Sequence, residues 1–299
     1  MTKQSKGALA FPWSYGMTFQ ELRHQPSLVR KPFVLYVALT TIERERATIM
    51  LANMARNRTV KPQHVRTLLR QIGDGDWCLN GAPILFTGDG QLVDGQHRLT
   101  AVVKSGNEIV SLVVVGISYE TALTTTDSGM SRSVTDRLTM EGQKSASILA
   151  AAANLFWMYR SGDVVFKGTE GRATHPEAVK LGTQDQTLIQ AASMSNAESQ
   201  YWRGFIGVSQ VALIRRILWD IDHDAAETFI ERLRRGMTDE DPDTDPIWRC
   251  RCAIQSRRAR GGDGRAGSIV PIVLHAWNLW RTGERRMFIR APATFPYPK

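Results

Sequence analysis

The sequence predicts an α+β protein: a small mixed sheet with helices, followed by an all-helical C-terminal half. Up to about residue 140, short apolar runs typical of strands alternate with segments of helical periodicity. Beyond Gly142 no convincing strand pattern follows, and glycine, proline and acidic turns separate the remaining segments. These segments predict helices at 145–160, 185–198, 208–219, 223–235 and 268–282.

The same change of character places a domain boundary near residue 142. Residues 1–30 are polar, contain prolines and show no sustained periodicity, so we expect an N-terminal arm there. The first domain would then span 31–142, and the helical domain would span 143–299.

Local patterns predict the elements of the first domain. A continuous apolar run indicates a buried strand, a threonine can cap a helix, and proline suits a first helical turn. They predict a strand at 34–38, a helix from Thr40 or Thr41 to about Ala55, and a helix from Pro62 to Gly73. Gly88-Asp89-Gly90 between two short apolar runs indicates a hairpin. A helix at 95–104 and a strand at 110–116 complete the domain.

Composition and charge narrow the function classes. Hydrophobic residues make up 42% and charged residues 22% of the chain, which excludes wholesale disorder. No apolar run approaches the roughly 20 residues of a membrane span, and the cysteines form neither a disulfide framework nor a metal cluster. We therefore expect a soluble, cytoplasmic protein without membrane contact. The formal net charge of +9 suggests a polyanionic partner.

The most informative local feature is Asp94-Gly95-Gln96-His97-Arg98, which predicts a strand, a glycine turn and a helix. A helix N-terminus carries partial positive charge, and an arginine in its first turn adds a phosphate ligand. Gly95 lets the backbone approach an anion closely, while Asp94 can cap the helix, orient His97 or Arg98, or bind Mg²⁺. The same pattern also fits an ordinary capped helix with a surface arginine, so spacing alone leaves both interpretations open.

The run DGQHRLTA, residues 94–101, resembles the signature of the ParB/sulfiredoxin-like superfamily. Over most of its length the chain is similar to phage- and plasmid-borne ParB-like proteins. The resemblance implies that 31–142 is a nucleotide-binding domain. In it, the residues Asp94–Arg98, which we call the box, begin a helix that holds nucleotide phosphates. Asn57 and Arg58 resemble part of the upstream box of partition proteins. Further matching residues are Trp77, Gly81, Asp127, Gly129, Arg132 and Ala276-Trp277-Asn278.

Two departures from the superfamily pattern limit the chemistry. Gln96 stands where sulfiredoxins carry their catalytic cysteine, so we do not expect sulfinic-acid repair. The box has His97 and Arg98 in place of the Glu-Arg-Arg of partition proteins, which leaves the nucleotide open between CTP and ATP.

A second polar cluster spans Thr125–Ser133. Asp127 could ligate Mg²⁺ through its carboxylate, and Arg132 could meet the outer phosphate. An acidic-Asn-x-x-Arg element of partition proteins holds triphosphate and metal at a similar place, so the resemblance implies the same roles here. The alternative is that Asp127 and Ser133 are turn and N-cap residues.

The segment Arg249–Arg265 contains six arginines and one acidic residue, Asp263. One interpretation is a solvated loop around the flexible Gly261-Gly262. The other is a nucleic-acid contact surface with salt-dependent binding, formed by Arg257, Arg258, Arg260 and Arg265. The segment 209–217 has some character of a DNA-reading helix, although its apolar spacing favours a core helix.

The first functional hypothesis is a nucleoside-triphosphate-binding, ParB-like protein of phage or plasmid DNA metabolism. It would act as a nucleotide-gated switch or as a slow, Mg²⁺-dependent NTPase, with DNA as a partner and homodimerisation possible. His97 or Asp94 would serve as the catalytic base. The pocket residues would be Asn57, Arg58, Asp94, Gly95, Gln96, His97, Arg98, Asp127 and Arg132.

Three alternatives stay open. A small-molecule kinase could use the same pocket. A non-catalytic DNA-binding adaptor would retain the box for structural reasons only. A ParB-like nuclease is less expected, because the sequence shows no clustered Asp and Glu set for two metals near the box.

Overall fold

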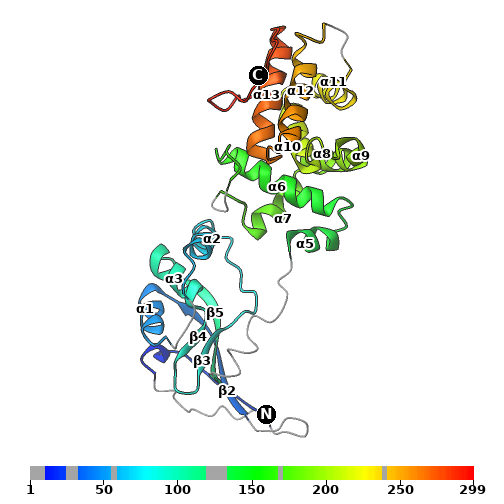
Figure 1. The fold of residues 1–299 in the computed structure, drawn as a ribbon. Helices are drawn as coiled ribbons and strands as arrows, with labels where there is room; N and C mark the ends of the chain where they lie inside the picture. Colours follow the sequence, from blue (N-terminus) through cyan, green and yellow to red (C-terminus); the bar gives the residue numbers. More distant parts are fainter. Residues whose placement is uncertain (1–10, 25–32, 55–58, 119–132, 168–170, 238–240) are drawn as a thin grey trace. The chain divides into compact units, whose positions relative to one another are not determined.

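A computed structural model describes residues 11–24, 33–54, 59–118, 133–167, 171–237 and 241–299 (Figure 1). The chain divides into two compact units, 1–131 and 132–299. The division lies before the boundary expected near residue 142, because helix α5 (Val134–Met140) packs against helices of the second unit.

The first unit is built on a five-stranded mixed sheet with the order β1-β2-β5-β3-β4. Strand β5 pairs antiparallel with β2 and parallel with β3, and the other pairs are antiparallel. The strands are β1 (Gln20–His24), β2 (Phe33–Ile42), β3 (Ile84–Thr87), β4 (Leu92–Asp94) and β5 (Ile109–Ile117). The α+β fold class is thereby confirmed, as is the expected hairpin, which β3 and β4 form.

Two expectations for this unit were wrong in detail. Part of the expected N-terminal arm belongs to the sheet, since β1 pairs with β2 and Trp13 stacks on Phe86 with ring centroids 3.9 Å apart. Thr40 and Thr41 do not cap a helix but extend β2, where they pair with Ser111 and Val110 of β5. Threonine is β-branched and fits a strand well, so pairing with β5 outweighs its capping tendency.

Among the described residues of the first unit, the α-helices are α1 (Arg44–Ala52), α2 (Pro62–Gly73) and α3 (Gln96–Ser105). Helix α3 packs against both α1 and α2. The core contains Met50 of α1, Leu68 of α2, Leu99 of α3 and Phe86 of β3, all of them buried. The first turn of α3, which carries the box, is thus held by a packed core.

The second unit is all-helical in its described residues. Its helices are α5, α6 (Ala146–Arg160), α7 (His175–Gln184), α8 (Gln186–Ala197), α9 (Ser199–Trp202), α10 (Val208–Trp219), α11 (His223–Arg235), α12 (Pro246–Ala259) and α13 (Ala266–Thr282). The five expected helices correspond to α6, α8, α10, α11 and α13, and are confirmed. Helices α5, α7, α9 and α12 were not among the predicted helices. None of the described helices is long and apolar enough to span a membrane.

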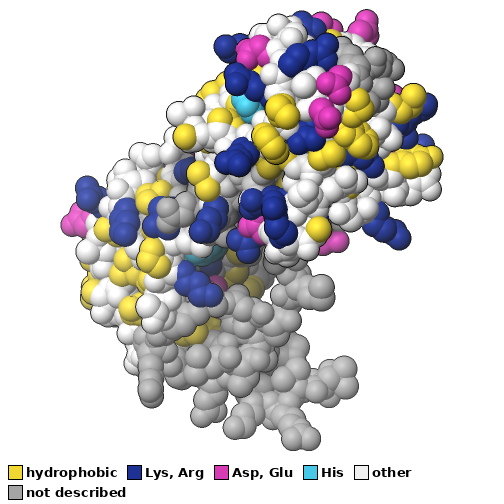
Figure 2. Space-filling view, turned by 45° about the horizontal axis from the view of Figure 1, so that its top comes forward, with side chains coloured by type: hydrophobic (Ala, Val, Ile, Leu, Met, Phe, Trp, Pro, Cys, Tyr) yellow, Lys and Arg dark blue, Asp and Glu magenta, His cyan; other side chains and the backbone are white. Residues whose placement is uncertain are grey.

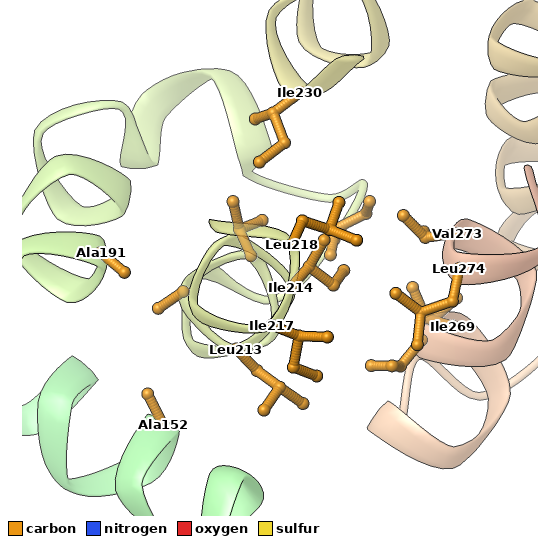
Figure 3. Packing of buried hydrophobic residues seen from close by; sticks show 14 of the residues in the cluster. Ala152, Ala191, Leu213, Ile214, Ile217, Leu218, Ile230, Ile269, Val273 and Leu274 are labelled. Carbon is orange, nitrogen blue, oxygen red and sulfur yellow. The ribbon is translucent and has the colours of Figure 1, made fainter. Parts of the chain in front are cut away.

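Helix α10 lies at the centre of this unit (Figure 3). Its side chains point toward small or branched residues of four surrounding helices, and nine of its twelve residues are buried. The segment 209–217 is therefore a core helix and does not present a face for reading DNA. The labelled contacts involve Ala152 of α6, Ala191 of α8, Ile230 of α11 and Ile269, Val273 and Leu274 of α13.

A buried ionic network ties α10 to its neighbours. Arg215 is only 1% exposed. Its guanidinium donates to Glu227 of α11 (2.8 Å), to Glu198 beside α9 (3.0 Å) and to Ser195 of α8 (3.0 Å). A buried guanidinium is tolerated only when its donors are satisfied, so this network fixes how α8, α10 and α11 pack.

Candidate functional site

The turn between β4 and α3 has the geometry that the box predicts. Gly95 joins the strand to the helix with φ +106° and ψ 0°, a left-handed conformation that side chains disfavour. A Cβ atom at this position would lie 3.0 Å from Cγ1 of Ile84. The glycine is therefore required both by its backbone conformation and by the close approach of β3.

The two residues after Gly95 point into the protein. Gln96 is 4% exposed and His97 is 7% exposed. Nε2 of His97 accepts a hydrogen bond from the backbone N–H of Lys61 (3.0 Å), and its ring meets that of His64 edge-on at 4.9 Å. Because Nε2 acts as an acceptor, a neutral ring carries its proton on Nδ1. His97 thus fixes the start of α2 against the start of α3.

Arg98 holds a neighbouring loop. Its Nη1 donates to the carbonyl of Ala82 (2.6 Å), and its Nη2 donates to the carbonyl of Pro83 (2.7 Å) and to Oδ2 of Asp94 (3.3 Å). The expected contact of Arg98 with a phosphate stays a prediction. The planar fork of arginine is suited to bridging two carbonyls and a carboxylate, so Arg98 anchors the segment before β3 to α3.

Of the three roles considered for Asp94, the structure supports one. Its carboxylate orients Arg98 through the contact at 3.3 Å. The N-cap position is occupied by Gly95, and no side chain caps the helix. The expected role of Asp94 as a Mg²⁺ ligand stays a prediction.

Four of the expected pocket residues, Asn57, Arg58, Asp127 and Arg132, lie outside the described residues. Their roles stay predictions from the resemblance. Within the part of the chain that is described, no group of three or more His, Cys, Asp or Glu side chains could hold a metal ion.

The expected basic loop is mostly helical. Arg257 and Arg258 lie in the last turn of α12, and the backbone N–H groups of Gly261 and Gly262 close that turn on the carbonyls of Arg258 (3.0 Å) and Arg257 (2.9 Å). The two glycines, which we expected to be flexible, thus form a compact helix end. Arg260 is the residue at the C-cap of α12.

The four expected nucleic-acid arginines do not act as one group. Arg258 donates to the carbonyl of Phe205 (3.3 Å), so it is turned toward the helical core. Arg265 precedes α13 and lies 3.9 Å from a carboxylate oxygen of Asp263. Arg257 and Arg260 line a common cavity. The sequence pattern could not single out Arg258, because its partner, the carbonyl of Phe205, comes from a distant part of the chain.

The hydrogen-bond partners of His97 and Arg98 could not be predicted from the sequence. Lys61, Ala82 and Pro83 contribute only backbone atoms, so no residue-type signal marks them. Pro62 directly after Lys61 is the one available hint, since it predicts that the N-terminus of a helix lies there.

The arrangement at α3 favours an anion. A helix of ten residues begins at a glycine turn, and its N-terminal end carries partial positive charge. The buried side chains of Gln96 and His97 fix the position of that end within the unit.

No protein-family model, no curated protein and no solved structure matches this chain.

Proposed function

We propose that the protein is a ParB-like, nucleoside-triphosphate-binding protein of phage or plasmid DNA metabolism, with DNA as its partner. The observation that supports this most is the left-handed Gly95 turn, which leads directly from a strand into the N-terminus of α3. Strand–glycine–helix turns are common phosphate sites because backbone and helix dipole both favour an anion.

The roles of the box residues differ from a simple phosphate cradle. The N-terminal end of α3 supplies the electrostatic attraction, and Gly95 allows the close approach. Arg98 is a positioning residue, because it holds the 82–83 segment that borders the turn. Asn57, Arg58 and Arg132 would add contacts as the resemblance implies.

A divalent cation would fit this proposal through Asp127, which the resemblance assigns to Mg²⁺. Bound Mg²⁺ neutralises phosphate charge and orients the phosphate chain. Asp94 is a weaker candidate, because its carboxylate already contacts the guanidinium of Arg98.

Between the two modes of action, a nucleotide-gated switch fits better than hydrolysis. A general base needs a free lone pair within reach of the attacking water. Nε2 of His97 instead accepts the N–H of Lys61. Nucleotide bound at α3 would change the position of α2, because the hydrogen bond between His97 and Lys61 links the two helix starts. The NTPase and kinase variants would need His97 to exchange this partner.

A specific observation also favours a second candidate, a non-catalytic DNA-binding adaptor with a structural box. His97 and Arg98 both make hydrogen bonds that hold the first unit together. A box kept only for packing would show the same bonds.

Equilibrium binding of CTP, ATP, GTP and UTP, each with and without Mg²⁺, separates these candidates when phosphate release is measured in parallel. Saturable binding of one nucleotide without release supports the switch. Binding with release makes the protein an NTPase. No binding of any nucleotide at millimolar concentration contradicts the proposal and leaves the adaptor.

A further inference from the structure

The helical unit contains a basic cavity that the box does not involve. It measures about 720 Å³ and lies between α12, the turn after it, α13 and the segment 288–291. Helices α12 and α13 lie side by side, orange to red in Figure 1. The residues that carry the argument are Arg249, Arg257, Arg260, Phe288, Arg290 and Cys252.

The charged residues that line this cavity are all basic. Four arginines line it, and no carboxylate is among its lining residues. Arg257 is held in place by Asp263 (3.3 Å) and Ser268 (3.0 Å), and Arg249 lies 4.0 Å from Asp243. Arg260 and Arg290 are exposed, and no described carboxylate forms an ion pair with either. Figure 2 shows that Lys and Arg are more abundant than Asp and Glu on the visible face of the molecule.

The carboxylate of Asp263, which lies beside the cavity, has a structural role. The Ser268 hydroxyl and the Arg257 guanidinium hold the pKa of the Asp263 carboxyl below its usual range. Asp263 therefore stays ionised at neutral pH and keeps Arg257 fixed against the turn after α12. A fixed guanidinium loses less conformational entropy on binding a phosphate than a mobile one.

An exposed aromatic ring borders the same cavity. Phe288 is 71% exposed, and the guanidinium of Arg249 lies 5.4 Å from its ring centroid. Ile272 and Ile289, which are both buried, add apolar surface to the lining of the cavity. An aromatic face, apolar surface and surrounding arginines together suit a planar base that is linked to phosphate.

We propose that this cavity binds nucleotides of single-stranded nucleic acid, with a base against Phe288 and phosphates on Arg257, Arg260 and Arg290. The volume lies within the range of small-molecule sites, which is enough for a nucleotide unit. The inference deepens the proposed function and rests on its DNA partner, because it names the surface and the form of nucleic acid.

The geometry favours a single strand over a duplex. In a duplex each base is stacked between its neighbours, so its face is not accessible to an aromatic side chain. Phe288 lines the cavity and is exposed, so an unstacked base could lie flat against its ring. A duplex would use the arginines alone.

The binding test uses the full chain and a fluorescent oligothymidylate, with anisotropy measured across a series of salt concentrations. Phe288→Ala is compared with Tyr201→Ala. Tyr201 is also exposed and also carries a guanidinium over its ring, that of Arg234 at 4.7 Å, but it does not line the cavity. We expect Phe288→Ala to weaken binding about 5- to 150-fold, and Tyr201→Ala to leave it unchanged.

The charge test uses matched double variants. Arg260→Gln with Arg290→Gln should flatten the plot of log affinity against log salt by roughly 0.7 for each lost phosphate contact. Arg203→Gln with Arg235→Gln removes the same charge from exposed positions outside the cavity and should leave the slope unchanged. Equal effects of the two pairs would overturn the proposal, because they would show only a general attraction.

Labelling of Cys252 measures occupation of the cavity without a substitution in its lining. Cys252 lines the cavity, Cys78 is exposed elsewhere, and Cys250 is buried. Burial raises the pKa of the Cys250 thiol, so this group should not react with a maleimide. In a Cys78→Ser protein, oligothymidylate should slow the labelling of Cys252. Unchanged labelling at saturating oligonucleotide would contradict the assignment of the site.

Failure of this inference can be told apart from failure of the proposed function. Binding of oligothymidylate that no cavity variant alters would overturn the cavity alone. Preference for duplex with no effect of Phe288→Ala would also overturn it while DNA remains a partner. No binding of any DNA at low salt would overturn both the cavity and the DNA part of the proposed function. Nucleotide binding at α3 is measured separately.

Discussion

At the scale of single residues, the side chains of His97 and Arg98 make hydrogen bonds to backbone groups from other parts of the sequence. Arg98 reaches carbonyls in the segment before β3, and His97 reaches the amide that begins α2. The motif predicted the turn correctly, because a strand, a glycine and a helix are local features. It could not predict what the side chains bind, since backbone atoms carry no residue-type signal.

Substitution of Arg98 tests its positioning role. Arg98→Ala removes hydrogen bonds from a charged donor, and we expect it to lower the local stability of α3 by about 1.5–3 kcal/mol. Arg98→Lys keeps the charge, but a single ammonium group cannot reproduce the planar fork, so it should be nearly as destabilising. Amide hydrogen exchange of residues 96–105 measures both. Full recovery of protection in Arg98→Lys would show that charge alone matters and would refute the positioning role.

Arg215 is the second residue whose role can be measured. Arg215→Met removes the guanidinium from between Glu198 and Glu227 and leaves two carboxylates without their cation. Because Glu198 and Glu227 keep 22% and 28% of their side-chain exposure, we expect the free energy of unfolding of the helical unit to fall by about 1.5–3 kcal/mol, the range for hydrogen bonds to charged groups and below that for a fully buried pair. Urea denaturation followed by circular dichroism gives this value.

The matched control is Arg235→Met, which removes an exposed guanidinium paired with Glu231. Its cost should be within about 1 kcal/mol, because exposed ion pairs contribute little. Similar costs for the two variants would mean that the network around Arg215 contributes no more than a surface pair.

At the scale of elements, Gly95 determines how α3 leaves the sheet. Gly95→Ala must place a side chain at φ +106° and bring Cβ to 3.0 Å from Cγ1 of Ile84. We expect a loss of about 1–3 kcal/mol in unfolding free energy. Gly73→Ala is the control, since it lies at the end of α2 with open space around it and should be neutral or slightly stabilising. Thermal melts of both variants are compared with the wild type.

The double variant Gly95→Ala with Ile84→Ala separates the two causes of strain. Ile84→Ala removes the two atoms that the new Cβ approaches most closely, Cγ1 (3.0 Å) and Cγ2 (3.1 Å), and leaves the backbone conformation unchanged. The costs of the two substitutions should therefore be less than additive. Strict additivity would mean that the close approach of Ile84 plays no part.

Elements with a clear apolar period could be predicted from the sequence, and elements without one could not. Helix α12 was missed because its arginines obscure the apolar positions Ile247, Cys250 and Ile254 that face the core. Asp245 followed by Pro246 was the available signal, since the Asp245 side chain caps the helix at Ile247 and proline suits its first turn. Strand β1 was missed because its sequence shows no sustained apolar period, and it forms a strand by pairing with β2.

At the scale of the whole molecule, the chain combines a sheet unit that carries the box with a helical unit that carries the basic cavity. Each unit has its own apolar core. The net charge of +9 suggested a polyanionic partner but not a location. In the folded chain four arginines line one cavity. Their position depends on the packing of α12, α13 and the segment 288–291.

Separate cores predict that the helical unit folds alone. A fragment of residues 132–299 should be helical by circular dichroism and should unfold cooperatively, because its core is composed of its own helices. If it also holds the cavity intact, Phe288→Ala should weaken oligothymidylate binding in the fragment as in the full chain. A fragment that lacks cooperative unfolding would show that the sheet unit is needed for its stability.

The central claim is that the N-terminal turn of α3 holds nucleotide phosphates. The most direct test is amide hydrogen exchange of residues 95–98, measured on the full chain with and without saturating nucleotide and Mg²⁺. We predict slower exchange at these amides, and at the amide of Lys61, because a phosphate at the turn would stabilise both hydrogen-bonded helix starts. Nucleotide that binds measurably but leaves exchange at these residues unchanged would contradict the account.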